Sequence, residues 1–249
     1  MEVRTLARED GETIAYLARE GKQPGVLWLG GFKSEMTGTK AETLDAWAAR
    51  TGRSYLRFDY FGHGKSSGDF RAGTISRWRD DALGVLDRLC DGPQILVGSS
   101  MGAWIALLAA RARPGMVKAM LLIAPAADFT EALMWRWMPP EVRSQIMEKG
   151  EWARPSAYDP EPYPITRALI EDGRTNLVMT ASIRVAFPVR ILQGMKDQDV
   201  PWQHAAKLAE TLEGDVVLTL VKNGDHRLST PADLARLERT LDALTTEVG

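Results

Sequence analysis

Short apolar segments alternate with amphipathic helical segments along most of this 249-residue chain. Each apolar segment ends at Gly, Pro or Asp, which is typical of strands buried on both faces of a parallel sheet. The helical segments between them would connect successive strands and cover both faces. The pattern predicts the α/β class, with a mostly parallel central sheet in one domain spanning residues 1–249. We expect core strands at residues 25–29, 54–59, 94–98, 119–124, 189–193 and 216–221.

Turn and capping signals add elements at both ends of the chain. Residues 2–7 and 12–19 flank an Asp-Gly pair, which is typical of a tight hairpin, so we expect an antiparallel hairpin at the sheet edge. Helical segments are predicted to start near Pro201 and near Pro231. Thr230 precedes the second of them, and its hydroxyl is placed to accept a hydrogen bond from a backbone N–H of the first turn.

One region interrupts the alternation. Residues 129–164 are rich in Pro, Trp and Met, show no strand pattern, and lie between two predicted core strands. We interpret them as a helical lid inserted over the sheet, with Trp135, Trp137 and Met138 as candidate substrate-binding residues. The alternative is that these side chains pack a peripheral helix and touch no ligand.

Composition excludes several classes of function. The chain has 31 basic and 33 acidic residues and a formal net charge of -2, so nucleic acid is not an expected partner. With one cysteine and three histidines it has no internal disulfide, and we expect no metal or cofactor. The most apolar run, residues 120–127, is too short to span a bilayer. The first residues lack a signal or transit pattern, so we expect a cytoplasmic protein. Oligomeric state has no signature here.

The pattern G-x-S-x-G occurs twice, around Ser100 at residues 98–102 and around Ser66 at residues 64–68. In a nucleophile elbow the serine lies in a sharp, strained turn between a strand and a helix, where a Cβ on either glycine would collide with neighbouring elements. An apolar strand leads directly into Ser100 and an apolar helix leads out. Ser66 follows a loop and precedes no helical period. Ser100 is therefore the predicted nucleophile.

A serine nucleophile needs a base, and the base needs a third group to orient it. In an α/β scaffold with such an elbow, the partners follow in the order serine, acid, histidine, on loops at the carboxyl ends of strands. Only His226, which comes after the last core strand, fits this order. We expect His63 to be a solvated loop residue and His204 to lie on a helix surface.

Three carboxylates are candidates for the orienting acid. Asp225 precedes His226 directly, and neighbouring side chains on extended backbone point apart. Asp199 stands before Val200-Pro201 and could instead cap the following helix. Asp197 follows a core strand and its glycine turn, and is the preferred acid, with Asp199 as the rival.

Acyl transfer also needs donors for a developing oxyanion, usually the N–H after the nucleophile and one from the loop after the first core strand. Met101 supplies the first. Phe32 is the predicted second donor, because two glycines before it allow the backbone to approach a substrate closely.

With these residues in place, the chain resembles the mitochondrial palmitoyl-protein thioesterase and acyl-glucuronide esterase branch of the α/β-hydrolases, together with its bacterial relatives. The resemblance extends over nearly the whole chain, and it implies the α/β-hydrolase fold and hydrolysis of carboxylic esters and thioesters with apolar acyl groups, without metal or cofactor. The family's nucleophile, acid and base fall on Ser100, Asp197 and His226. The segments that carry it include Gly31-Phe32, residues 36–40, 57–60, 78–79 and 91–100, Gly194-Met195-Lys196-Asp197, residues 200–202, and Asp225-His226-Arg227.

The leading functional hypothesis is hydrolysis of an acyl substrate through an acyl-enzyme on Ser100. The same triad could instead support carbon–carbon bond hydrolysis, perhydrolysis or aminopeptidase activity. A non-catalytic ligand-binding protein on this scaffold is the alternative from another class.

Overall fold

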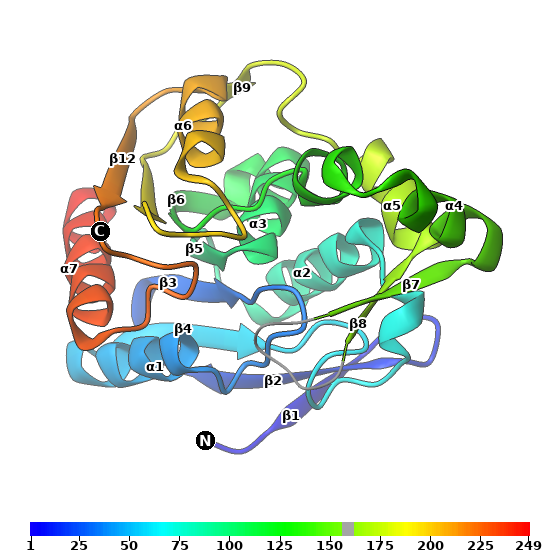
Figure 1. Ribbon diagram of the computed structural model, residues 1–249. Helices are drawn as coiled ribbons and strands as arrows, with labels where there is room; N and C mark the ends of the chain where they lie inside the picture. Colours follow the sequence, from blue (N-terminus) through cyan, green and yellow to red (C-terminus); the bar gives the residue numbers. More distant parts are fainter. Residues whose placement is uncertain (156–161) are drawn as a thin grey trace.

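Eight strands form the central sheet of the computed structural model, which describes residues 1–155 and 162–249 (Figure 1). Their order is β1-β2-β4-β3-β5-β6-β10-β12, with β2 antiparallel to both neighbours and the remaining pairs parallel. Every core strand and the edge hairpin predicted from the sequence are present. The strands are β1 (Arg4–Ala7), β2 (Thr13–Arg19), β3 (Lys22–Leu29), β4 (Arg53–Phe58), β5 (Gln94–Ser99), β6 (Val117–Ile123), β10 (Val189–Gly194) and β12 (Val216–Val221).

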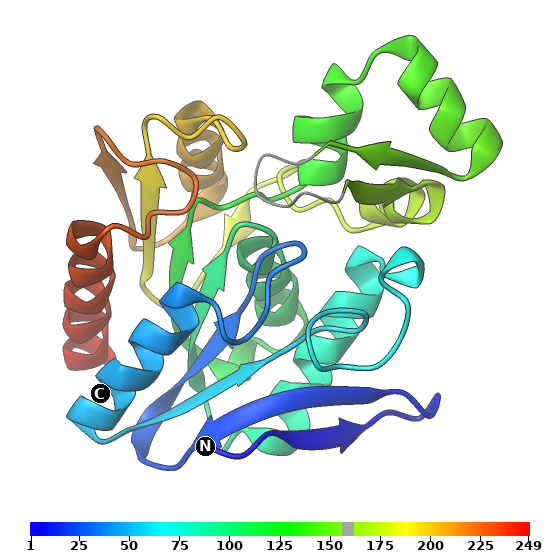
Figure 2. The ribbon, with the colours of Figure 1, turned by 60° about the horizontal axis from the view of Figure 1, so that its bottom comes forward.

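Helices cover both faces of this sheet (Figure 2). Alternate residues of β3 show the division: Val26 and Trp28 belong to the core beneath α1 and α7, whereas Leu27 and Leu29 belong to the core beneath α2, α3 and α6. Both sets are buried, as expected of a parallel strand between two helical layers. The covering helices are α1 (Thr39–Thr51), α2 (Ile75–Leu89), α3 (Met101–Ala112), α6 (Trp202–Thr211) and α7 (Pro231–Val248).

The predicted starts of the two C-terminal helices are confirmed. Pro201 immediately precedes α6, and α7 begins at Pro231. The Thr230 hydroxyl accepts a hydrogen bond from the backbone N–H of Asp233, and the Asp233 carboxylate accepts from the Thr230 backbone, which completes a capping box.

Residues 129–155 and 162–175, which we call the cap segment, lie between β6 and β10 and project to one side of the sheet (Figures 1 and 2). Helices occur there as expected, but β7 and β8 also pair as an antiparallel ladder, so the expectation that this region contains no strand is wrong. The ladder strands are too short for a clear alternation, and part of the predicted lid, residues 156–161, lies outside the described residues. Its elements are η3 (Thr130–Met134), η4 (Trp135–Trp137), α4 (Pro140–Lys149), β7 (Glu151–Arg154), β8 (Tyr163–Thr166) and α5 (Arg167–Thr175).

Two short helices and one small ladder complete the described elements. Among the described residues, no helix combines the length and apolar character needed to cross a membrane. The remaining elements are η1 (Phe70–Ala72), η2 (Pro114–Met116), and the parallel two-residue strands β9 (Ile183–Arg184) and β11 (Leu212–Glu213).

Candidate active site

Ser100 lies in a strained turn between β5 and α3, as predicted. Its backbone has φ 54° and ψ -117°, a conformation that non-glycine residues rarely adopt. A Cβ on Gly98 would collide with the backbone of α3, and one on Gly102 would collide with the Leu29 carbonyl oxygen of β3. The two glycines therefore let the strand and helix approach closely enough to form the turn.

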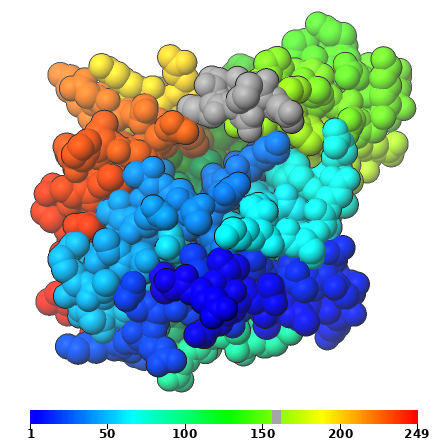
Figure 3. Space-filling model, turned by 90° about the horizontal axis from the view of Figure 1, so that it is seen from below, coloured from blue at the N-terminus to red at the C-terminus, as the bar shows by residue number. Residues whose placement is uncertain are grey.

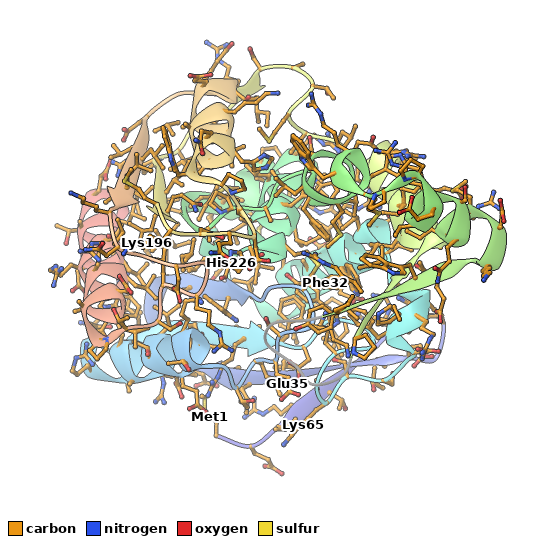
Figure 4. The ribbon with its side chains drawn as sticks, in the orientation of Figure 1. Met1, Phe32, Glu35, Lys65, Lys196 and His226 are labelled. Carbon is orange, nitrogen blue, oxygen red and sulfur yellow. The ribbon has the colours of Figure 1, made fainter. Side chains whose placement is uncertain are left out.

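The structure brings Ser100, His226 and Asp197 together from three separate loops. The Ser100 hydroxyl lies 3.1 Å from His226 Nε2, and His226 Nδ1 lies 2.8 Å from Asp197 Oδ2. Both distances are within hydrogen-bond range, so Nδ1–H donates to the carboxylate and Nε2 is free to accept the serine proton. His226 comes from the loop after β12, near the centre of the molecule in Figure 4.

The Asp197 carboxylate is fully engaged. Its side chain has no exposed surface, Oδ1 accepts from the backbone N–H groups of Asp199 and Val200 at 2.9 and 2.8 Å, and Oδ2 also accepts from Gln193 Nε2 at 3.1 Å. These bonds fix the carboxylate beneath His226.

The rival carboxylates have other positions. Asp199 does not cap α6, whose N-cap residue is Pro201 with no side-chain bond, and its Oδ1 lies 3.9 Å from an Arg154 nitrogen at the cavity. Asp225 turns away and accepts from the Leu228 backbone N–H at 2.9 Å. The structure therefore assigns the contact with His226 Nδ1 to Asp197.

The serine of the second G-x-S-x-G motif is hydrogen-bonded to backbone groups. Ser66 Oγ donates to the Asp59 carbonyl oxygen at 2.5 Å and accepts from the Ala15 backbone N–H at 2.8 Å. These bonds join the loop after β4 to the edge hairpin, and no described histidine contacts this hydroxyl.

The loop after β3, residues 30–34, runs beside the nucleophile, and we call it the β3 loop. A Cβ on Gly31 would lie 3.5 Å from the Ser100 Cβ, so the backbone before Phe32 passes directly against the elbow. Met101 is the first residue of α3, and its N–H has no acceptor within the helix. Both predicted oxyanion donors thus flank Ser100.

A cavity of about 400 Å³ opens at Ser100 and His226. Figure 3 shows a hollow in the surface between the orange segment, which contains the loop after β12, and the blue β3 loop. The lining contains both apolar and charged side chains, which suits a ligand with an apolar body and a polar end. The apolar residues include Phe32, Met101, Ala126, Phe129, Leu133 and Met134; the charged residues include Lys33, Glu35, Lys40, Arg154, Asp199 and Arg227.

The predicted lid contacts do not match the structure. Trp137 is 74% exposed, Trp135 lies beneath two arginine side chains, and Met138 packs in a cluster inside the cap segment. None of the three lines the cavity at Ser100, whereas Leu133 and Met134 do. The reason is local: a wide π turn in η3 passes into a tight 3₁₀ turn in η4, which changes the residues that face the sheet.

Of the two other histidines, one differs from expectation. His63 is only 3% exposed, and burial lowers its pKa to about 4. His204 lies on α6 with a partly exposed side chain, as expected; its Nε2 lies 2.8 Å from the Ala127 carbonyl oxygen, and partial burial lowers its pKa. Neither contacts Ser100.

Lys40 is a cavity residue whose contacts the sequence did not reveal. Its ammonium donates to the carbonyl oxygen of Arg227, the residue after His226, and burial lowers the pKa of Lys40 to about 8. Lys40 therefore ties the start of α1 to the loop that carries His226.

Asp197, Asp199 and His226 place possible metal-ligand atoms within 4.8 Å of one another. The arrangement is weak as a metal site, because both Asp197 oxygens already accept hydrogen bonds and one of them holds the His226 ring.

These features are those of an α/β hydrolase, and the family comparison agrees. The model of the Alpha/beta hydrolase family matches residues 26–237, so the chain belongs to this family. It is 40% identical over 241 residues to the mitochondrial palmitoyl-protein thioesterase ABHD10 of Mus musculus, covering 96% of this chain and 81% of the relative.

Solved structures give the same result. A structure described as a hydrolase from Agrobacterium vitis S4 is 48% identical, with a TM-score of 0.93, and covers 98% of this chain and 99% of that chain. Mouse alpha/beta hydrolase domain-containing protein 10 is 38% identical, also with a TM-score of 0.93, over the whole of both chains. The resemblance inferred from the sequence is thereby confirmed.

The expected cytoplasmic location is contradicted. Curated relatives from mouse, orangutan, cattle and human are all named mitochondrial. Our expectation rested on the first residues of the chain and on its single cysteine. The single cysteine does not distinguish the cytoplasm from other locations, because a lone thiol is compatible with any reducing compartment.

Proposed function

We propose that this protein is a serine hydrolase that cleaves carboxylic esters or thioesters through an acyl-enzyme on Ser100. The observation that carries the proposal is the continuous hydrogen-bonded chain from Ser100 through His226 to Asp197, at the edge of a cavity. The thioesterase names of the curated relatives support the ester and thioester class.

In the first half of the reaction, Ser100 Oγ attacks the acyl carbon while His226 Nε2 takes the hydroxyl proton. The carbonyl oxygen becomes an oxyanion, which the N–H groups of Phe32 and Met101 stabilise. Collapse of the tetrahedral intermediate breaks the bond to the leaving group, and His226 returns the proton to the departing alcohol or thiol.

In the second half, water attacks the acyl-enzyme as His226 accepts one of its protons. The ester bond to Ser100 then breaks, the proton goes back to Oγ, and the carboxylic acid leaves. Asp197 remains ionised throughout and stabilises the imidazolium that forms at each step.

The cavity supports an apolar acyl group. Phe129 and two residues of η3, Leu133 and Met134, belong to its apolar lining, so an acyl chain bound against them would contact the cap segment. Charged lining residues, among them Lys40 and Arg227, could then contact the leaving group. The thioesterase names of the curated relatives favour ester and thioester hydrolysis over the other reactions of the same triad.

A fluorophosphonate probe tests the nucleophile. We expect the wild-type protein to be labelled and Ser100→Ala to be unlabelled and inactive on p-nitrophenyl esters and acyl thioesters. Ser66→Ala is the matched control and should retain both labelling and activity, because its hydroxyl only joins the loop after β4 to the edge hairpin. Absence of labelling in the wild-type protein would instead support a non-catalytic binding protein.

A further inference from the structure

The β3 loop contains a residue in a strained conformation. Lys33, directly after Phe32, has φ 57°, in the left-handed region that non-glycine residues rarely adopt. The Ser34 N–H bonds back to the Gly31 carbonyl oxygen at 3.1 Å, which closes a tight turn. Phe32 is the second residue of this turn, so the direction of its N–H depends on the turn. A contact that stabilises the turn therefore also orients the Phe32 N–H.

His63 provides that contact from the loop after β4. The Lys33 backbone N–H donates to His63 Nε2 at 3.1 Å, and His63 Nδ1 lies 3.1 Å from the Phe61 carbonyl oxygen. Nε2 must be unprotonated to accept the first bond, so Nδ1 carries the proton and donates the second. The two bonds define one neutral tautomer with a fixed ring orientation.

Aromatic packing connects the same two groups. The His63 ring contacts Phe70 and Trp78 with centroids 5.0 and 5.3 Å apart. The Phe32 ring contacts the same two side chains at 5.0 and 5.8 Å. The Lys33 ammonium lies 5.5 Å from the Phe70 centroid and 5.4 Å from that of Tyr163. His63 and Phe32 thus pack against the same two aromatic side chains.

We propose that His63 is a positioning residue for the oxyanion donor: by accepting the Lys33 N–H, its neutral imidazole holds the turn that directs the Phe32 N–H toward the substrate carbonyl. His63 does not line the cavity, and its hydrogen bonds do not involve Ser100. This inference rests on the proposed function, in which the Phe32 N–H stabilises the oxyanion.

The test compares His63→Gln with His63→Asn. The Gln amide oxygen reaches the position of Nε2 and can accept from Lys33, whereas the shorter Asn side chain reaches only the position of Nδ1. We expect kcat of His63→Asn to fall on the order of 10- to 100-fold, with KM changed by less than about threefold. His63→Gln should stay within about threefold of wild type in both parameters.

A trifluoromethyl ketone that adds to Ser100 provides a readout that a purely structural role would not move. The inhibition constant of this ketone should rise for His63→Asn by the same factor by which kcat falls, because the adduct carries the oxyanion. The affinity for the unreactive ketone of the same chain length should not change. His204→Asn is the control, since it alters a partly buried histidine away from the β3 loop, and its kcat should stay within about twofold.

Equal kcat values for the Gln and Asn variants, or a loss expressed only in KM, would overturn the positioning role. These outcomes differ from failure of the proposed function, which would appear in the wild-type protein as absent labelling and absent ester hydrolysis.

Discussion

Acid should destabilise this protein through His63, and the size of the effect follows from burial. The imidazole is 3% exposed, and its pKa falls from 6.5 to about 4, mainly because burial disfavours the charged ring and secondarily because the Lys33 ammonium is near. Between pH 6.5 and 4 the unfolded chain therefore binds a proton at this residue that the native protein does not bind. The free energy of unfolding must decrease as pH falls through this range.

The magnitude follows from the two pKa values. One pKa unit corresponds to about 1.4 kcal/mol, so the difference between 6.5 and about 4 amounts to about 3 kcal/mol lost between pH 7 and pH 4. The contribution is complete above pH 6.5. A loss of this size is a substantial part of the stability of a typical domain.

Urea unfolding at a series of pH values, on wild type and His63→Gln, measures the effect. The amide does not titrate, so the wild-type free energy of unfolding should fall about 3 kcal/mol further than that of the variant between pH 7 and 4. The raised pKa values of the buried Asp59 and Asp128 act in both proteins and cancel. Parallel pH profiles for the two proteins would refute a buried, neutral His63.

Three further sets of variants test the site. Asp197→Asn should lower kcat on the order of 10³- to 10⁴-fold, and Asp199→Asn by less than about tenfold, because only the first carboxylate contacts the imidazole; steady-state kinetics on one ester compares them. Gly102→Ala should cost about 3 kcal/mol or fail to fold, since its Cβ would meet β3 backbone that cannot move away, and thermal unfolding would report it. Met134→Trp should shift the preferred acyl chain to shorter lengths, whereas Trp137→Ala, altering a side chain outside the cavity, should leave the chain-length profile unchanged.

The sequence was most informative where local chemistry and backbone geometry coincide. The strand before Ser100 and the helix after it distinguished this serine from Ser66, and the strained turn explains why both glycines are required. The choice of Asp197 depended on its position after β10. Its four hydrogen bonds involve groups whose convergence only the folded chain shows.

Contacts made by irregular segments were not predictable in the same way. Trp135 and Trp137 were expected to meet substrate because large aromatic residues often do, but the change from a π turn to a 3₁₀ turn directs them elsewhere. His63 was expected to be solvated because it lies in a loop. Burial of a loop residue depends on what packs over it, here Phe70 and Trp78, and short-range patterns carry no record of that.

The saturated Asp197 carboxylate has a consequence for turnover. Two backbone N–H groups and Gln193 hold it before any ligand arrives, and the His226 ring is aligned as a result. In the proposed reaction, little solvent or side-chain reorganisation is then needed when positive charge develops on the imidazole. The entropy of ordering these groups is lost once, when the chain folds, rather than in every catalytic cycle.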